Sequence, residues 1–368
     1  MLTARRVQPM TKVAVVRTSP KTVLSDVARV MDLAEYRRHV SRDLVTTVKL
    51  NLSWSKFYPA CSTNPYILDG VLTKLISDGF EARKIQAVEN ETVVTNIYAG
   101  ARGNNWYPVM KKHKVRFLPL IKAHYVDVKL PRRTLVLEDI FGEVVAPREI
   151  FRTNIIHLPT IKTHGHTQMT GAMKDSFGLY LTKKRHLAHL KIHEVLVDLL
   201  LIQKTISNSE FVVTDGTVLG DGAGPRTMVP KIGNVLLATH DMVAADTVQT
   251  RLMGIDQSLV HKLRIANELG LGECNPDRIE IVGDFDSWED LPNFHLKPGK
   301  SPVIAWNRGF LKFPGMETFL FRSPLMWLPA QLSGFYHDGI WLPLRGRKWV
   351  RWFLEETEWG ELWKSYSG

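Results

Sequence analysis

Short apolar runs alternate with stretches of helical spacing over the first 120 residues of the chain. Runs of this length that are rich in β-branched residues predict buried strands. They fall at residues 12–18, 44–52, 84–90 and 113–120. Between the first two, residues 22–36 carry apolar side chains at the spacing of one helix face. Such an alternation predicts a mainly parallel sheet with helices on both faces.

A second helix in this region has both a start signal and a stop signal. Asn64 is a residue type that caps helix N-termini, and Pro65 follows where proline commonly begins a helix. The apolar spacing continues to Gly79, and glycine is the common residue just past a helix end. We therefore expect a helix that begins at Pro65 and ends before Gly79.

The pattern changes after residue 120. Three strand-like segments, 125–130, 134–139 and 142–147, predict a short β insertion. Residues 151–162 predict a buried strand, and residues 184–206 have the spacing of a helix. The remaining expected elements are a strand at 211–217, a glycine-rich loop at 215–225, a strand, turn and helix at 233–254 with Asp241 as N-cap, a short helix ending near Gly270, and a strand at 277–284.

The chain after residue 300 differs in composition, because seven of the ten tryptophans lie there among arginine and lysine residues. We expect these aromatic side chains to pack on the core as a lid or an oligomer contact, or to lie at a membrane surface. The whole pattern predicts an α/β fold, with mainly parallel sheet flanked by helices, a short β insertion and a Trp-rich C-terminal extension. The expected units are an N-terminal α/β lobe (1–125), a central α/β lobe (126–295) and the basic extension (296–368).

The composition is that of a globular protein, with 44% apolar and 23% charged residues. No run of about 18 uncharged apolar residues occurs, and the first residues lack the apolar stretch of a secretion signal. Two cysteines, Cys61 and Cys274, supply neither a disulfide framework nor the four thiolates of an iron–sulfur cluster. We therefore expect a cytoplasmic protein that holds no such cluster.

A formal net charge of +11 favours anionic partners. The basic residues are spread along the chain without a nucleic-acid-binding signature, so nucleic acid is not the expected partner. A small anionic ligand is expected instead. A homo-oligomer, and a membrane surface contacted through the C-terminal extension, are further alternatives.

Histidine is concentrated in one segment. Five of the thirteen histidines lie within thirty residues, and they are His164, His166, His186, His189 and His193. Histidine titrates near neutral pH and binds metals, so a turn that brings several of them together would form a metal site. The candidate ligands are His164, His186 and His189. The alternative is that these side chains only pack or donate hydrogen bonds.

Lys174 stands in the same segment, in a glycine-containing turn close to Lys183, Lys184 and Arg185. Neighbouring positive charge and burial both lower the pKa of a lysine, which then acts as a base or forms a covalent link. Lys174 and His164 are the expected reactive pair, with His166 and His189 as further catalytic candidates. The alternative is a lysine that only positions a phosphate or lies on the surface.

Other polar residues and glycines lie at the ends of predicted strands or beside the histidine segment. In open α/β sheets, ligands bind beyond the carboxyl ends of the strands. The candidate substrate- or cofactor-binding residues are therefore Lys49, Asn51, Lys162, Arg185, Asp215, Gly222, Gly224, Asp241 and Asp246.

Several segments together resemble a widespread family of uncharacterised proteins, domain of unknown function 362. They include VKLNL, STNPYILDGVLTKLISDGF, IIHLPTIKTHGHTQMTGAMKDSFGL, VTDGTVLGDGAGP and LLATHDMVAADTVQTRLMG, within residues 12–285. The resemblance implies an α/β fold and names no reaction. Many members of that family carry a cysteine-rich, ferredoxin-like module whose cysteines this chain lacks.

A shorter stretch is similar to the nickel-dependent lactate racemases. In those enzymes a histidine precedes by ten residues a lysine that tethers a nickel-pincer nucleotide, with a glycine seven residues after the histidine. Here His164, Gly171 and Lys174 have that spacing, and His189 follows at the expected distance. The similarity implies that Lys174 lies in the pocket. It suggests a metal (nickel, iron or zinc) or a nucleotide-derived group as cofactor.

The sequence therefore predicts a cytoplasmic enzyme that acts on a small anionic substrate in a Lys/His pocket. Redox or proton-transfer chemistry fits these residues, as in an oxidoreductase, a racemase or an isomerase. The alternative is a non-catalytic binding or assembly protein that uses the basic surface and the Trp-rich tail.

Overall fold

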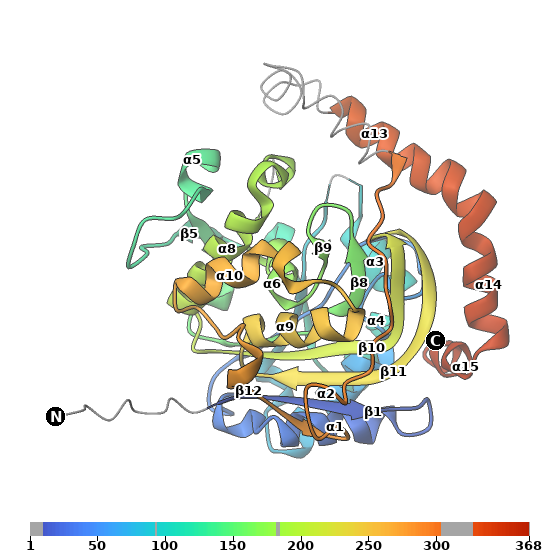
Figure 1. The fold of residues 1–368 in the computed structure, drawn as a ribbon, viewed down its shortest axis with the longest axis horizontal. Helices are drawn as coiled ribbons and strands as arrows, with labels where there is room; N and C mark the ends of the chain where they lie inside the picture. The colour runs from blue at the N-terminus through green and yellow to red at the C-terminus, as the bar shows by residue number, and fades with distance from the viewer. Residues whose placement is uncertain (1–9, 93, 182–184, 303–326, 368) are drawn as a thin grey trace.

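The computed structural model describes residues 10–92, 94–181, 185–302 and 327–367, and within these residues ten strands form one mixed sheet (Figure 1). The strands are β1 (Thr11–Arg17), β2 (Thr46–Lys49), β3 (Ile85–Glu89), β4 (Arg116–Pro119), β7 (Asn154–His157), β8 (Thr160–His164), β9 (Gln168–Met169), β10 (Ser209–Ala223), β11 (Thr227–Thr239) and β12 (Ile279–Gly283). The order across the sheet is β12–β1–β11–β10–β7–β2–β3–β4, with β8 beside β10 and β9 beside β8.

Most strand pairs in this sheet are parallel. Strands β4, β3, β2 and β7 run parallel to one another and to the start of β10, and β12 runs parallel to β1. The β10–β11 hairpin and the β1–β11 pair are antiparallel. The predicted α/β class is confirmed. Because β1 pairs with β11 and β2 pairs with β7, residues from both predicted lobes contribute to the same sheet.

Helices cover both faces of the sheet (Figure 1). They are α1 (Val23–Leu33), α2 (Pro65–Ser77), α3 (Ile97–Gly103), α4 (Trp106–His113), α5 (Leu137–Phe141), α6 (Ala172–Asp175), α7 (Phe177–Tyr180), α8 (Ile192–Ile206), α9 (Met242–Met253), α10 (His261–Glu268), α13 (Trp327–Phe335), α14 (Arg347–Glu356) and α15 (Glu358–Ser365). One apolar cluster joins α1, α2 and α4 to the sheet, and another joins α8, α9 and α10 to the opposite face. Pro65 begins α2, and Gly79 follows its end with φ +89°, as predicted.

The predicted strand at 151–162 is divided in two. β7 ends at His157 and β8 begins at Thr160, with Pro159 between them. Proline has no backbone N–H, so it cannot continue a central sheet ladder, and the chain bends there. The bend separates β8 from β2 and leaves it between β10 and the short strand β9. His164 therefore lies at the end of a strand that projects from the sheet.

The β insertion contains two strands rather than three. β5 (Tyr125–Asp127) pairs with β6 (Val145–Pro147) in antiparallel register, as expected for 125–130 and 142–147. The prediction for 134–139 was wrong, because Leu137–Phe141 form α5. The Asp198 carboxylate, from α8, accepts the backbone N–H groups of residues 135, 136 and 137. This contact with a distant residue stabilises a helix start that the local pattern does not indicate.

The glycine-rich segment 215–225 is not a loop, because residues up to Ala223 belong to β10, which pairs with β11. Its glycines allow close packing instead. A Cβ on Gly216 would lie 2.8 Å from the Val235 carbonyl oxygen, and one on Gly224 would lie 1.9 Å from that of Thr163. Gly224 therefore lets the end of the hairpin approach β8 more closely than a residue with a side chain would allow.

The predicted helix 184–206 begins later than expected. Arg185–Lys191 form a 3₁₀ helix, and α8 begins at Ile192. The three histidines of this segment are thus divided between two elements, with His186 and His189 in the 3₁₀ helix and His193 in α8. His193 packs beside His261 and accepts the backbone N–H of Lys262, whereas His189 lies near His166. The side chain of His186 lies outside the described residues, so its predicted ligand role stays untested.

The C-terminal extension is helical and packs aromatic side chains on the core. Packing on the core was the first of the two predicted alternatives, and a membrane surface was the second. It contains α13, a π-helical stretch (Tyr336–Gly346), α14 and α15. Phe353, Trp359 and Trp363 are buried in the cluster that includes α1 and α2. Trp359 Nε1 also donates to Asn234 Oδ1 at 2.8 Å. Within the described ranges, no helix is both long and apolar enough to cross a membrane.

Candidate functional site

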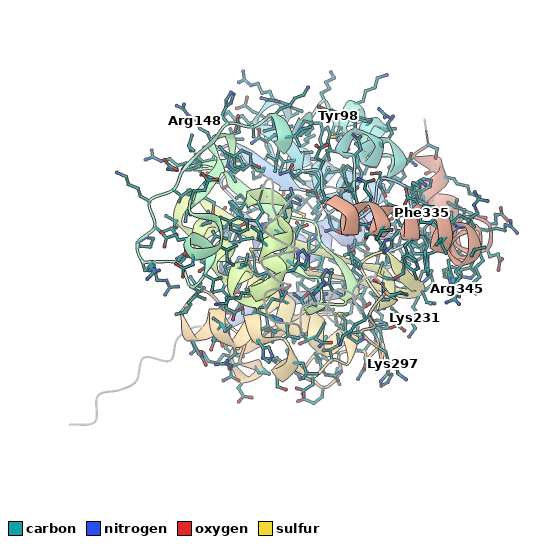
Figure 2. All side chains as sticks on the ribbon, turned by 90° about the horizontal axis from the view of Figure 1, so that it is seen from above. Tyr98, Arg148, Lys231, Lys297, Phe335 and Arg345 are labelled. Atoms are coloured by element: carbon teal, nitrogen blue, oxygen red, sulfur yellow. The ribbon has the colours of Figure 1, made fainter. Side chains whose placement is uncertain are left out.

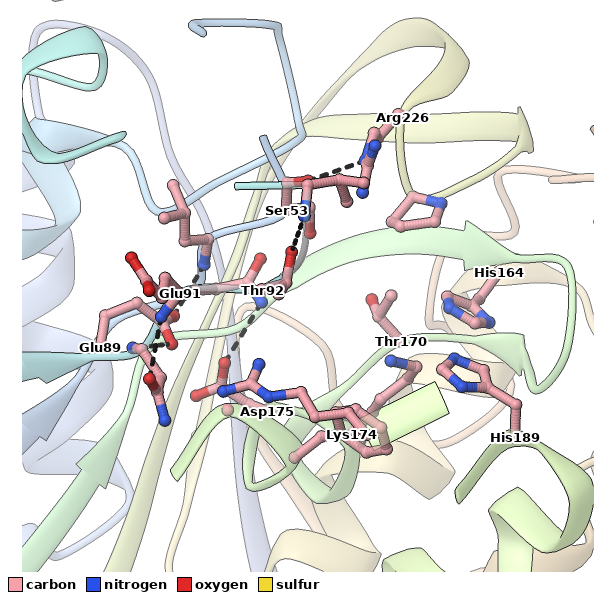
Figure 3. A pocket seen from close by; sticks show the side chains of 18 of the residues that line it. Ser53, Glu89, Glu91, Thr92, His164, Thr170, Lys174, Asp175, His189 and Arg226 are labelled. Atoms are coloured by element: carbon pink, nitrogen blue, oxygen red, sulfur yellow. Dashed lines mark hydrogen bonds between the residues drawn. The ribbon is translucent and has the colours of Figure 1, made fainter. Parts of the chain in front are cut away.

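A cavity of about 960 Å³ lies beyond the carboxyl ends of β2 and β3, beside β8 and α6 (Figure 3). Ligand-binding cavities commonly have volumes of about 300–1,000 Å³, so this one has room for a small metabolite or a nucleotide. It brings together eight of the predicted site residues, which are Lys49, Asn51, His164, His166, Lys174, Arg185, His189 and Gly224. The cavity is lined by parts of the predicted segments 49–51, 162–193 and 215–225, whereas no residue of 240–246 lines it.

Five other predicted residues do not line the cavity; two of them, Asp246 and Lys162, support the residues that do. Asp246, on α9, accepts the backbone N–H groups of Ala172 and Met173 at the start of α6. It also pairs with Lys262 at 2.6 Å. Gly171 has φ +90°, and a Cβ there would lie 2.2 Å from Asp246 Oδ1. The carboxylate and the glycine together fix the turn that carries Lys174.

Lys162 lies beneath the cavity wall and orients Asn51. Its amine donates to Thr160 Oγ1 at 2.6 Å, to the Cys61 carbonyl at 2.9 Å, and to Asn51 Oδ1. Burial lowers the pKa of Lys162 to about 8. Asn51 then presents its amide nitrogen to Asp175 at 3.2 Å.

The remaining three predicted residues have local partners outside the cavity. Asp215 accepts hydrogen bonds from Asn64 and Thr217. Asp241 caps α9, as predicted, and also accepts the backbone N–H of Glu273. Gly222 has φ +102°, and its carbonyl oxygen accepts the Thr163 hydroxyl at 2.8 Å. These residues shape the strands and helices around the site.

Lys174 projects into the cavity from α6 (Figure 3). Among the residues that the structure describes, none accepts a hydrogen bond from its amine or forms an ion pair with it. The amine instead lies 4.9 Å from the centroid of the Phe177 ring. Burial, followed by the positive charges of Lys262, Lys162 and Arg185, lowers the pKa of Lys174 to about 7. A neutral amine that is present at neutral pH can accept a proton or attack a carbonyl group.

His164 lies beside Lys174 and is also held neutral. Burial, together with the nearby charge of Lys174, lowers the pKa of His164 well below its ordinary value. Its Nδ1 accepts the backbone N–H of His166 at 3.2 Å. In the neutral ring the proton is then on Nε2, which is a hydrogen-bond donor. Lys174, His164, His166, His189, Arg185 and Arg226 are called the cationic end of the cavity below.

The histidines of the cationic end are near one another but do not form a recognisable metal site. The ring centroids of His164 and His166 are 5.8 Å apart, and those of His166 and His189 are 5.0 Å apart. Over the described part of the chain, no group of three or more His, Cys, Asp or Glu side chains is arranged to hold a metal ion. Because the side chain of His186 lies outside the described residues, the predicted metal site stays a prediction.

The opposite part of the cavity, called the ion-paired end, contains Lys49, Glu89 and Asp175. Lys49 Nζ is 2.9 Å from Glu89 Oε2 and 3.3 Å from Asp175 Oδ1, and all three side chains are almost inaccessible. Burial raises the pKa of Glu89 despite the opposing charge of Lys49. Burial acts in the same direction on Asp175, but Lys49 and His157 together hold its pKa below the ordinary value.

His157, which the sequence did not single out, extends this end into the core. Gln203 Nε2 donates to Glu210 Oε2, so the Gln203 amide oxygen faces His157 Nε2 at 2.9 Å. That nitrogen must carry a proton. The other ring nitrogen is 3.0 Å from Asp175 Oδ2. His157 therefore connects the ion-paired end to Gln203 in the core. His157 ends β7 and lies inside the predicted strand 151–162, where no sequence signal distinguished it from a buried strand residue.

Further cavity residues come from segments that the sequence did not connect to the site. Arg226 follows the glycine-rich segment, and its Nε donates to the Ser53 carbonyl at 3.0 Å (Figure 3). Burial lowers the pKa of Arg226. Ser333 and His337, from the C-terminal helices, complete the wall. No sequence signal connected Arg226, Ser333 or His337 to this cavity.

A family model matches residues 46–251, more than half of the chain, and its description is "Domain of unknown function (DUF362)". The chain belongs to this family. The predicted family resemblance is confirmed, and every predicted site residue from Lys49 to Asp246 lies inside the matched range. Ser333 and His337 lie outside it.

The chain is also similar to the thylakoid-associated protein sll1697 of Synechocystis sp.. The two are 26% identical over 176 residues, which is 45% of this chain and 53% of that protein. The chain thus spans about half the length of this relative. Neither match extends to the lactate racemases, so that similarity stays a prediction, as does the cytoplasmic compartment.

Proposed function

We propose that this protein is an enzyme that acts on a small anionic substrate by proton transfer, with Lys174 as the base. The observation that supports it is the state of the Lys174 amine, which reaches the cavity and has no ion-pair partner within the described residues. Its pKa of about 7 means that a large fraction is neutral at neutral pH. A base is most effective when its pKa is close to the working pH.

The other groups of the cationic end have complementary roles in this proposal. The anionic group of the substrate is held by the guanidinium groups of Arg226 and Arg185, since arginine matches the geometry of carboxylates and phosphates. The Nε2–H of neutral His164 donates to an oxygen on which negative charge develops. Lys174 takes a proton from the substrate, and the ammonium so formed returns it.

A small carbon acid fits these roles, because proton removal next to a carboxylate needs both a neutral base and a cationic surrounding. The ion-paired end supplies a rigid opposite wall whose charges are already compensated. The sequence also favoured redox chemistry. That alternative needs an electron-carrying cofactor, and the cavity is large enough for one of the size of a nucleotide.

The proposal is tested first by deuterium exchange. The purified protein is incubated in D₂O with pyruvate, lactate, glycolate and malate, and the loss of each C–H signal is followed by proton NMR. We expect exchange in at least one compound, with a rate that rises through pH 7 as Lys174 loses its proton. Lys174→Met and His164→Ala should slow the exchange at least 100-fold, since general acid–base catalysis contributes about 10²–10⁴-fold.

A second experiment measures the reactivity of the Lys174 amine without knowledge of the substrate. Glyoxylate and cyanoborohydride convert a neutral amine to a carboxymethylamine, which intact mass and peptide mass spectrometry detect. We expect Lys174 to be labelled first at pH 7, and lactate or phosphate to protect it. Lys262 is the matched control, because it is buried but paired with Asp246. Equal labelling of Lys174 and exposed lysines at pH 7, together with no exchange in D₂O, would contradict the proposal.

A further inference from the structure

The C-terminal arm, defined as α13, the π-helical stretch and α14 (residues 327–356), has two different faces. Its inner face is fixed to the body of the protein. Trp341 is 8% exposed and packs against Tyr58, with ring centroids 5.3 Å apart. Asp338 accepts the indole N–H of Trp54 at 2.6 Å and pairs with Lys56 at 3.2 Å. The arm is therefore held in one orientation, and its outer face is defined.

The outer face of the arm carries large apolar side chains in contact with solvent. Phe335 is 65% exposed and Leu344 is 77% exposed, the two highest values among the large apolar side chains of the described residues. Leu332 and Ile340 accompany them at 48% and 39%. Elsewhere in the described chain, exposed residues of this kind are dispersed over many different elements. An apolar cluster of this kind in contact with water usually marks a binding surface.

Basic residues follow this apolar cluster directly. Arg345, Arg347, Lys348 and Arg351 are all exposed, and Figure 2 shows Phe335 and Arg345 together on the arm. Between Asp338 and Glu355 the sequence has no acidic residue. Within the described residues, none of these four basic side chains forms an ion pair. The outer face thus combines exposed apolar groups with uncompensated positive charge.

We propose that the outer face of this arm binds the surface of an anionic lipid bilayer. Large apolar side chains beside arginine and lysine are the features of helices that lie in the membrane interface. The apolar side chains enter the boundary between headgroups and acyl chains, and the basic residues contact the negative headgroups. A bilayer fits both properties of the face, whereas an apolar protein partner would leave the four charges uncompensated. The proposal does not depend on the chemistry of Lys174.

Attachment of the arm would place the cavity beside the bilayer. Ser333 and His337 line the cavity from the same helical stretch whose opposite side carries Phe335 and Ile340. The arm lies outside the range matched by the family model. We therefore expect lipid binding to be a property of this chain that the matched part alone does not have.

The test is co-sedimentation of the full-length protein with vesicles of phosphatidylcholine alone and of phosphatidylcholine with 30% phosphatidylglycerol. We expect binding to the anionic vesicles and little binding to the neutral ones, with a decrease as salt is raised. Phe335→Ser/Leu344→Ser should weaken binding at least tenfold. A basic residue near an anionic surface contributes about 1 kcal/mol, so the loss of one should weaken binding about fivefold. Arg347→Gln/Lys348→Gln should therefore weaken binding about 25-fold.

The matched controls are Leu24→Ser/Leu259→Ser, which remove exposed leucines from other parts of the surface, and Lys111→Gln/Lys114→Gln, which remove exposed charges from the end of α4. They should bind like the unaltered protein. Equal binding to neutral and anionic vesicles, or equal losses in the control and arm variants, would overturn the proposal.

Two other occupants of the face give distinct results, and either would also overturn the proposal. If a second copy of the chain covers it, the unaltered protein will sediment as a dimer in analytical ultracentrifugation, and Phe335→Ser/Leu344→Ser will convert it to a monomer. If residues 303–326 of the same chain cover it, this variant will lower the unfolding temperature without lipid. The lipid proposal predicts a monomer with an unchanged unfolding temperature.

Discussion

The two ends of the cavity each contain a lysine, fully buried in the case of Lys49 and half-buried in that of Lys174, and the two lysines differ in their partners. Lys49 lies between Glu89 and Asp175, whose carboxylates compensate its charge. Lys174 lies near the Phe177 ring and several other cations, and although the charge of Asp175 opposes them, its pKa falls to about 7. The partners of each lysine therefore decide which of the two is reactive. The lysine without a carboxylate partner is available for chemistry, and the paired one holds the structure together.

The largest effect should follow from removal of the paired lysine. Lys49→Met leaves Glu89 and Asp175 as uncompensated charges in the core, and breaking a buried ion pair in this way costs about 3–5 kcal/mol. Urea denaturation should show this decrease in the free energy of unfolding. Lys12→Met is the matched control, because the Lys12–Glu35 pair is partly exposed and should contribute less than about 1 kcal/mol. A Lys49→Met variant as stable as Lys12→Met would remove the distinction between the two ends.

The next effect concerns the support of the unpaired lysine. Asp246→Ala leaves Lys262 unpaired and two N–H groups of α6 without an acceptor, so it should lower the free energy of unfolding by about 3 kcal/mol. Glyoxylate labelling of Lys174 at pH 7 should also slow. The double variant Asp246→Ala/Lys262→Met should regain part of the stability. A double variant less stable than Asp246→Ala would show that the ion pair is not the main contribution.

Removal of the unpaired lysine should stabilise the protein, in contrast to the two preceding changes. Lys174→Met should raise the free energy of unfolding at pH 7 by about 2 kcal/mol, because an amine whose pKa is depressed in the folded state destabilises the fold. In the unaltered protein the folded pKa is about 7 and that of an unfolded lysine is about 10.4. Between these two pH values the unfolded chain binds more protons than the folded protein. The free energy of unfolding of the unaltered protein therefore rises with pH.

The difference in the free energy of unfolding between Lys174→Met and the unaltered protein should therefore decrease from pH 7 toward pH 10. Urea denaturation at several pH values measures this change. A variant that is less stable than the unaltered protein at every pH would mean that Lys174 has a favourable partner in solution.

The smallest effect concerns the charges around Lys174. Arg185→Gln removes one of the positive charges that lower its pKa, so the pKa should rise by less than about one unit. The midpoint of glyoxylate labelling against pH measures this shift. Lys191→Gln, on the same 3₁₀ segment, is the control and should leave the midpoint unchanged. A fall in the midpoint after Arg185→Gln would contradict the electrostatic explanation.

The local pattern predicted most of the sheet, because strands and helix termini depend on nearby residues. Pro65, Gly79 and Asp241 occupy the positions expected of them at the ends of α2 and α9. The errors have a common cause. The helix at 137–141 depends on the Asp198 carboxylate, and the glycines of β10 depend on the proximity of β8. Both contacts join residues far apart in the sequence.

The candidate site could be predicted in part. His164 and Lys174 were found because they lie ten residues apart in one segment. His157 and Arg226 were missed because each is an isolated residue in its own segment. Asp246 was expected in the pocket, but it lies behind α6 and supports the turn. Residue type and chain position could not distinguish a residue that faces the cavity from one that supports its wall.

The sequence by itself determined the α/β class, the family and the segment that carries the histidines and Lys174. Only the tertiary structure decided which lysine is compensated. Lys49 meets Glu89 across 40 positions and Asp175 across 126. Charge interactions depend on distance in space and on burial, and neither is recorded in the order of residues. The pKa of Lys174, and with it the proposed chemistry, therefore follows from the folded arrangement.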